Sequence, residues 1–251
     1  MDDESLYRKI QDALNEIPGN FNILEEQIDI QLQMEYFEFV KKFREGPLMD
    51  DFLGDSAVLL DPNADIDTRK KVLAALASVS DVEAFRTIER YLTHPDPELK
   101  DWAILALQES RMLLQSSLLE EQQVFISTGL GGKGKKLRYF LVFINQSGGQ
   151  LTAMQKKLLH DELKYAVEKN DGELEEFNQL IDFNTAMVVL PVKAMLKDVF
   201  KGVIDECNQY GNFLKQDMVI TNVKRLSPLE ILELLNELHS SDESIGESDD
   251  A

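Results

Sequence analysis

Apolar residues recur at helical spacing through the first half of the chain. The pattern predicts a helix that ends at Pro18, a longer helix over Ile23–Phe43 and a shorter one over Leu48–Leu60. Glycine and proline residues separate these segments, as is usual at helix ends. No strand is expected before Ser117, so residues 1–119 are predicted to form an α-helical domain.

A repeat lies inside this helical half. Asp65–Leu76 can be laid over Asp96–Leu107 at a constant offset of 31 residues, since 96 − 65 = 31. In each segment an aspartate precedes a helix that contains several alanines, and a second helix is predicted between them over Val82–Leu92. Alanines let neighbouring helices approach closely, and one helix pair cannot bury its apolar face alone. The segments are therefore expected to stack on one another.

The repeat resembles the HEAT-like repeat of the bilin-lyase type. The resemblance covers residues 61–118 and is carried by Arg69–Leu76, His94-Pro95-Asp96-Pro97 and Lys100–Leu107. It implies stacked helix pairs that present a repeat-type surface. Bilin lyases resemble longer all-helical arrays, which the pattern after residue 119 contradicts.

The second half alternates strands and helices. Short β-branched and aromatic runs alternate with amphipathic segments, which predicts strands at 123–128, 137–144, 174–183, 186–190 and 218–223, and helices at 151–167, 191–209 and 228–238. From Leu137 the order is strand, helix, strand, strand, helix, strand, which is ferredoxin-like. Residues 120–239 are therefore predicted to form a ferredoxin-like α/β sandwich domain, and the fold class of the chain is α+β.

Two features of this half go beyond the order of its elements. The strand over 137–144 is apolar on both faces, so the face turned away from the helices needs a cover, either from the helical half or from a partner chain. Ser227 and Glu230 form the pattern of a capping box at the start of the last helix. Residues 240–251 are almost entirely Ser, Asp, Glu and Gly, and they are predicted to be a disordered acidic tail.

Charge and cysteine content bear on which partners and which cellular location the protein is expected to have. The chain has 46 acidic and 26 basic residues, a net charge of −20, which disfavours nucleic acid and anionic membranes and favours basic partners. The acidic start, Met-Asp-Asp-Glu-Ser, is not expected to act as a signal peptide, and no apolar run is long enough to span a membrane. A cytoplasmic protein is expected. The single cysteine, Cys207, lies on the apolar face of a predicted helix and is expected to be a buried, inert thiol.

The glycine-rich segment from Gly129 to Lys135 fits the first part of a phosphate-binding loop. Lys136 stands where such a loop needs Ser or Thr, and a strand rather than a helix follows, so a hairpin loop is the better interpretation. The same region holds the one basic cluster of the chain, formed by Lys133, Lys135, Lys136 and Arg138. This cluster is a candidate partner contact, for another protein, for a second copy of the chain or for nucleic acid.

The remaining candidates give no catalytic or metal site. His94, His160 and His239 lie far apart and lack zinc-site spacing, so no catalytic residue, metal ligand or cofactor is predicted. Trp102, the only tryptophan, aligns with Lys71 of the repeat, which favours an outward-facing position and a role as a partner contact.

The sequence therefore predicts a non-catalytic protein-interaction or scaffold module that uses a helical-repeat surface. Its partner is expected to be a protein, with self-association as a further possibility. Two alternatives stay open: an enzyme with a site between the two halves, and a nucleic-acid-binding protein that uses residues 133–138.

Overall fold

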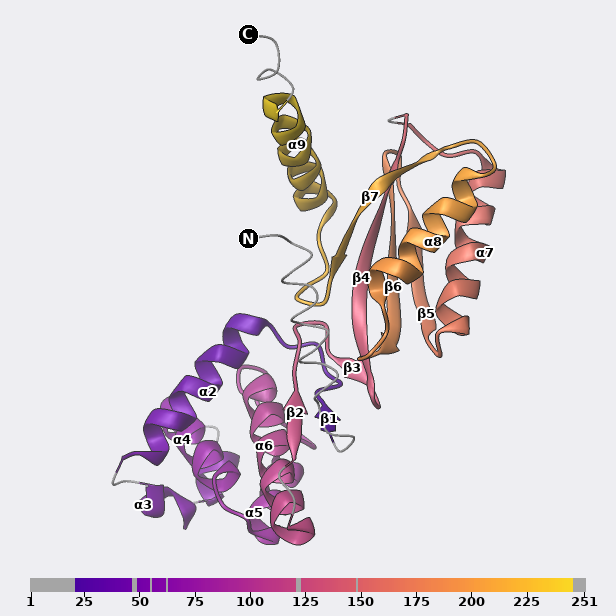
Figure 1. Cartoon of the computed structure of the whole chain (residues 1–251). Helices are drawn as coiled ribbons and strands as arrows, with labels where there is room; N and C mark the ends of the chain where they lie inside the picture. The colour runs from indigo at the N-terminus through magenta and orange to yellow at the C-terminus, as the bar shows by residue number, and fades with distance from the viewer. Residues whose placement is uncertain are drawn as a thin grey trace. The chain divides into compact units, whose positions relative to one another are not determined.

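The computed structural model describes residues 21–46, 49–54, 56–61, 63–120, 123–147 and 149–245, with the side chains of the last helix described as far as Asn236. The chain combines helices with an antiparallel sheet and divides into two compact units, residues 1–135 and residues 136–251 (Figure 1). The segment 120–135, assigned from the sequence to the second domain, groups with the first unit. Each unit is described by itself.

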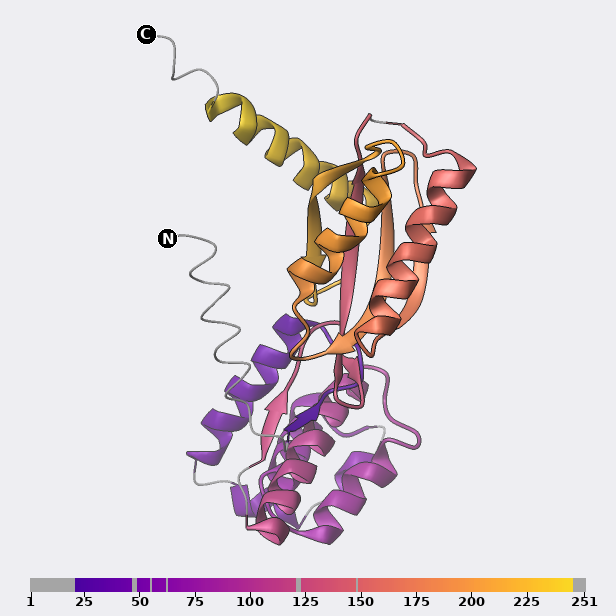
Figure 2. The same ribbon diagram turned by 45° about the vertical axis from the view of Figure 1, so that its right-hand side comes forward.

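The first unit is mainly helical (Figure 2). Its helices are α2 (Ile30–Arg44), α3 (Met49–Leu53), the 3₁₀ helix η1 (Ser56–Leu60), α4 (Ile66–Ala77), α5 (Val82–Tyr91) and α6 (Lys100–Leu119). Aspartates start three of them: the carboxylates of Asp29, Asp65 and Asp81 accept backbone N–H groups of the first turns of α2, α4 and α5. Such caps satisfy amide groups that have no partner within the helix.

The two copies of the repeat meet through α4 and α6. These helices lie in contact, and α5 contacts both of them. The alanines of α4 and α6 at 74, 75, 77, 103 and 106 are fully buried, which allows the close approach. Arg69, itself 5% exposed, donates to Asp96 at 3.0 Å and so joins the first copy to the turn that precedes α6. Asp96 occupies the position of Asp65 in the repeat.

A short strand before the helices was not predicted. Residues Phe21–Ile23 form β1, which pairs in parallel with β2 (Val124–Ile126). The expectation of no strand before Ser117 is therefore wrong, and the helix predicted from Ile23 starts at Ile30. The partner strand lies far along the chain, so local periodicity could not reveal the pairing. The helix predicted to end at Pro18 lies outside the described residues.

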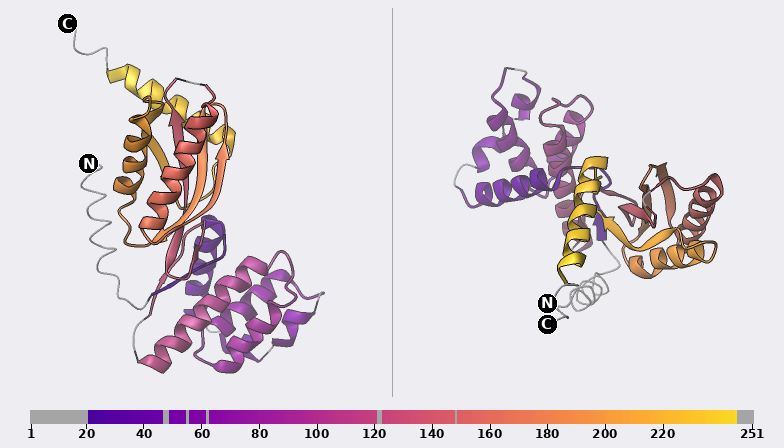
Figure 3. Two further views of the ribbon diagram at one scale, coloured as in Figure 1. Left: turned by 90° about the vertical axis from the view of Figure 1, so that its right-hand side faces the viewer. Right: turned by 90° about the horizontal axis from the view of Figure 1, so that it is seen from above.

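The second unit is built on an antiparallel sheet. Its elements are β4 (Lys136–Asn145), α7 (Ala153–Lys169), β5 (Glu173–Gln179), β6 (Phe183–Pro191), α8 (Leu196–Asn208), β7 (Leu214–Thr221) and α9 (Pro228–Ile245), and the two-residue strand β3 (Gly132–Lys133) comes directly before β4. The four long strands lie in the order β7-β4-β6-β5, each antiparallel to its neighbours. Helices α7 and α8 cover one face of the sheet (Figure 3). The predicted order of elements from Leu137 is confirmed.

Both faces of β4 are buried, as its sequence requires. Phe140, Met187 and Glu176 are register partners and share the face turned away from α7 and α8. Over this face Arg225, in the segment that leads to α9, donates to Glu176 at 2.6 Å. Helix α9 lies on the same side of the sheet and buries Ile231. The segment after β7 thus contributes to the cover, whereas the sequence predicted a cover from the helical half or from a partner chain.

The last helix begins as predicted and ends later. Ser227 and Glu230 exchange hydrogen bonds as a capping box, with the Ser227 N–H donating to the Glu230 carboxylate at 2.8 Å. The helix continues to Ile245, so the prediction of a disordered tail is wrong for residues 240–245. Strong helix formers such as Glu and Leu carry α9 through most of its length. Residues 246–251 lie outside the described residues.

The repeat contact predicts a difference between two matched variants. Asp96→Asn should destabilise the helical unit by about 2 kcal/mol, because it leaves the buried guanidinium of Arg69 without its counter-charge. Asp65→Asn should change stability by less than about 0.5 kcal/mol, since asparagine caps helices as well as aspartate. Urea unfolding followed by the fluorescence of Trp102 measures both. Equal effects of the two variants would contradict the proposed importance of the Arg69–Asp96 pair.

Candidate interaction surfaces

The glycine-rich segment after β2 is a tight turn packed against the loop that follows β1. Gly131 has a φ of +65°, and a Cβ there would lie 2.4 Å from the carbonyl oxygens of Glu25 and Glu26, so only glycine fits. The N–H of Gly134 donates to the Glu25 carboxylate at 2.7 Å. A strand follows this segment and not a helix, so it does not have the geometry of a phosphate-binding loop. We call residues 128–134, which hold the loop after β1 in place, the clamp.

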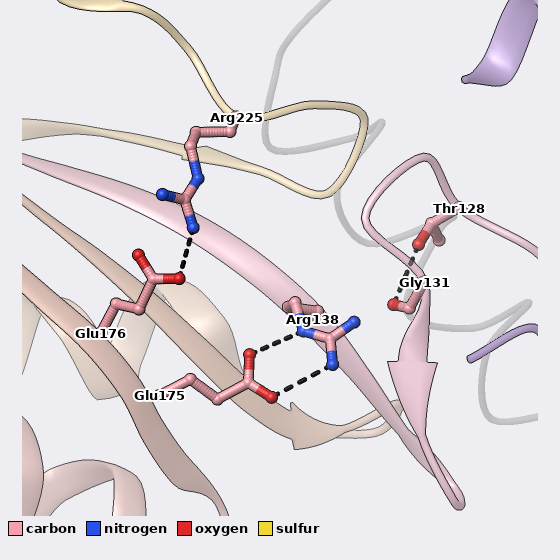
Figure 4. A network of polar contacts seen from close by, with 6 residues as sticks. All are labelled: Thr128, Gly131, Arg138, Glu175, Glu176 and Arg225. Atoms are coloured by element: carbon pink, nitrogen blue, oxygen red, sulfur yellow. Dashed lines mark hydrogen bonds and ion pairs between the residues drawn. The ribbon is translucent and has the colours of Figure 1, made fainter. Parts of the chain in front are cut away.

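Two polar side chains support this clamp. The Thr128 hydroxyl donates to the carbonyl oxygen of Gly131 at 3.3 Å, which closes the turn (Figure 4). Gln33 is 3% exposed, and its amide donates to the carbonyl oxygens of Ile28 and Thr128 at 2.8 and 3.2 Å. Buried amides of this kind need partners, and here they fix the turn to the start of α2. Polar residues such as Gln31 and Glu35 surround Gln33 in the sequence, so local sequence contained no signal for this role.

A cleft of about 380 Å³ lies beside the clamp, and we call it the β1–α6 cleft. Its apolar floor comes from Leu92, Ile104 and Leu107, and β1 forms one wall. The polar and charged lining residues are Asn22, Glu25, Glu26, Gln108, Arg111 and Lys135. An apolar floor with a few placed polar groups is the usual composition of a binding surface.

The polar groups of the cleft are held in place by neighbours. Lys135 Nζ lies 5.5 Å from the centroid of the Phe21 ring. The Arg111 guanidinium donates to Gln108 at 3.2 Å and lies 5.9 Å from the ring of Phe85. Side chains fixed before binding lose less conformational entropy when a partner arrives.

A buried polar network joins α2 to α6 elsewhere in this unit. The Tyr36 hydroxyl and the Arg44 guanidinium each donate to the carboxylate of Glu109 at 2.6 Å. Burial, which outweighs the opposing effects of Tyr36 and Arg44, raises the pKa of Glu109. Burial and the neighbouring carboxylate raise the pKa of Tyr36 well above 10, so it stays a hydrogen-bond donor. The groups satisfy one another, which fits a structural role.

Trp102 belongs to the core of the helical unit. It is 3% exposed, packs edge-to-face against Tyr36 and Phe39 at centroid distances of 5.1 and 5.3 Å, and has Lys70 Nζ 4.5 Å from its ring. The outward-facing position predicted for Trp102 is therefore wrong. Helix α2 covers this side of α6, and because α2 lies outside the repeat, alignment with Lys71 could not show it.

The four cations of the predicted basic cluster have different surroundings. Arg138 donates to both carboxylate oxygens of Glu175, at 2.6 and 3.1 Å (Figure 4), and Lys136 lies 3.1 Å from the carboxylate of Asp171. Lys135 lines the β1–α6 cleft, and Lys133 is exposed in β3. Because acidic groups of the same chain lie beside Lys136 and Arg138, this cluster offers less positive charge to a partner than its sequence indicates.

The histidines lie in separate surroundings. His94 Nδ1 is 3.1 Å from the Thr93 hydroxyl, and His160 lies 3.0 Å from Asp161 with its ring against Phe177. The side chain of His239 lies outside the described residues. Within the described part of the chain, no group of three His, Cys, Asp or Glu side chains is placed to hold a metal ion.

Comparisons with known proteins do not assign this chain to a family. No family model matches the chain, and no curated protein is a significant match. Among solved structures, a candidate transposase from Deinococcus radiodurans aligns with 43% of this chain and 93% of its own, at 15% sequence identity and a TM-score of 0.34. Within the part of the chain that the structure describes, no helix is both long and apolar enough to cross a bilayer.

The raised pKa of Glu109 predicts a pH-dependent stability. The folded state binds this proton more tightly than the unfolded state, so the stabilisation is complete below pH 4.5, the ordinary pKa, and declines as pH rises toward the folded-state pKa. The difference in the free energy of unfolding between the wild type and Glu109→Gln should therefore decrease as pH rises from 4.5 to the folded-state pKa of Glu109. Urea unfolding at a series of pH values measures it. Glu35→Gln, on the exposed side of α2, is the control, and a constant advantage would contradict the assignment.

The thiol of Cys207 is predicted to be inert in the folded protein. Burial raises its pKa to about 12, and the nearby carboxylates of Glu162 and Glu206 act in the same direction. Its reaction with a disulfide reagent at pH 8 should be at least about a hundredfold slower than that of free cysteine. Denaturation should restore normal reactivity. Gly202→Cys in a Cys207→Ala background places a thiol at an exposed position of α8 and should react rapidly.

Proposed function

We propose that this protein is a non-catalytic interaction module that binds a protein partner through its helical-repeat unit. The observation that carries the proposal is the β1–α6 cleft, where an apolar floor from α6 and from Leu92, which follows α5, meets charged groups of both signs. Helical repeats commonly bind partners along concave surfaces made by successive helices. A mixed-charge rim around an apolar centre matches the composition of protein–protein interfaces.

The HEAT-like interpretation of residues 61–118 supports this role. The stacking of α4, α5 and α6, the buried alanines and the Arg69–Asp96 tie between equivalent turns are features that such a repeat requires. Glu25 and Glu26, which contact Gly131, and the nearby Gly134 and Lys135 line the cleft.

We interpret the second unit as a ferredoxin-like sandwich. The strand order β7-β4-β6-β5 and the two helices on one face support this interpretation. Its edge strand β5 carries Glu173, Glu175 and Glu176 and has a bulge between Leu174 and Glu176. Charges and bulges on an edge strand disfavour pairing with another chain, so a partner strand is not expected to extend the sheet.

Variants in the cleft test the proposal. Arg111→Glu and Glu26→Lys reverse charges on its rim, and each should reduce partner recovery in quantitative affinity capture from the native host by about tenfold. Arg86→Glu makes the same change on an exposed part of α5 away from the cleft and should leave recovery unchanged. Identical recovered proteins for the wild type and both cleft variants would remove the cleft from consideration.

A further inference from the structure

A second concave surface lies on the other unit, between α7 and α8. This groove has a volume of about 600 Å³, and we call it the α7–α8 groove. Its centre is apolar and includes Val199 and Tyr165, with Tyr165 62% exposed. Met195, 48% exposed, lies toward one end. Large apolar side chains exposed along one groove are typical of a binding surface.

The polar residues of the groove are mainly acidic. Glu162 and Glu206 both lie close enough to Cys207 to act on its thiol, so they belong to the same end of the groove. Asp198 is a third carboxylate, and Lys169 is the one cationic lining residue. Among the described residues no ion pair engages these three carboxylates, and Glu206 accepts only an amide hydrogen bond from Gln209. Their charge is therefore available to a ligand.

Gly202 keeps the floor of the groove open. It lies inside α8, and a Cβ at this position would meet nothing within 4 Å. Packing therefore does not require glycine here, and its backbone has none of the positive φ values that favour glycine. Glycine is a poor helix former, and at this position it leaves the floor of the groove without a side chain.

We propose that the α7–α8 groove binds a basic segment of a partner protein, with an aliphatic or aromatic side chain over Gly202 and Lys or Arg residues beside Glu162 and Glu206. Charge complementarity selects this occupant: the groove presents three unpaired carboxylates and one cation, on a chain with a net charge of −20. Nucleic acid and anionic lipid are disfavoured by the same charges. The lining from Glu162 to Asn170 spans about 12 Å of helix, which suits about two turns of a bound helix or four extended residues.

This site is independent of the β1–α6 cleft, and its test uses a defined probe. A library of random 12-residue peptides is selected on the purified full-length protein, and the best clone is made as a labelled peptide for fluorescence anisotropy. Enriched clones should place Lys or Arg within a few residues of Leu, Ile, Met or Phe. Gly202→Leu, which fills the floor, and the double variant Glu162→Lys/Glu206→Lys should each weaken binding by about tenfold.

Matched controls separate loss of the site from loss of the fold. Gly202→Ala leaves the floor nearly open and Glu168→Lys changes charge elsewhere on α7, so both should bind within about twofold of the wild type. Because leucine is a better helix former than glycine, Gly202→Leu should keep its circular dichroism spectrum. The proposal is overturned if no clone is enriched, if enriched clones lack basic residues, or if Gly202→Leu binds as well as Gly202→Ala.

Discussion

The helical unit depends on a close approach between two backbone segments from its opposite ends. Pairing of Phe21 with Val124 brings together residues separated by 124 − 21 = 103 positions, at a considerable cost in loop-closure entropy. Gly131 makes the contact possible because its missing side chain lets the turn lie directly on the carbonyl groups of residues 25 and 26. Together with the pairing to β2, this contact supports β1, which forms one wall of the β1–α6 cleft. Core packing of the helices and the binding surface therefore share one structural requirement.

Glycine serves opposite purposes in the two units. At 131 a Cβ would overlap backbone atoms, and the turn also needs a positive φ, so the residue is fixed by the fold. At 202 a Cβ would enter empty space in a regular helix, so the fold does not explain the residue. Sequence alone treats both as helix or strand breakers. Their surroundings distinguish a glycine that the fold requires from one that leaves the floor of the α7–α8 groove without a side chain.

Local patterns predicted the elements that carry their own signals. The two-faced apolar run of β4, the capping box at Ser227 and the alternation of strands and helices in the second unit depend on neighbouring residues, and each is present. The failures involve distant partners. The residues near Phe21 do not predict a strand, because its partner strand lies far along the chain. The residues near Trp102 likewise do not indicate that α2 covers its side chain. The groove was missed for the same reason, because its two walls come from separate helices.

Most of the acidic excess of the chain is not neutralised by its arginines. Arg44, Arg69, Arg138 and Arg225 are each paired with a carboxylate of the same chain, which leaves the acid excess in the remaining surface. That excess attracts basic partners from a distance, but salt screens it beyond about 8 Å under physiological conditions. Attraction of this range speeds encounter and discriminates poorly between one basic protein and another. Selectivity must come from short-range contacts, and a groove whose apolar centre is kept open beside unpaired carboxylates provides them.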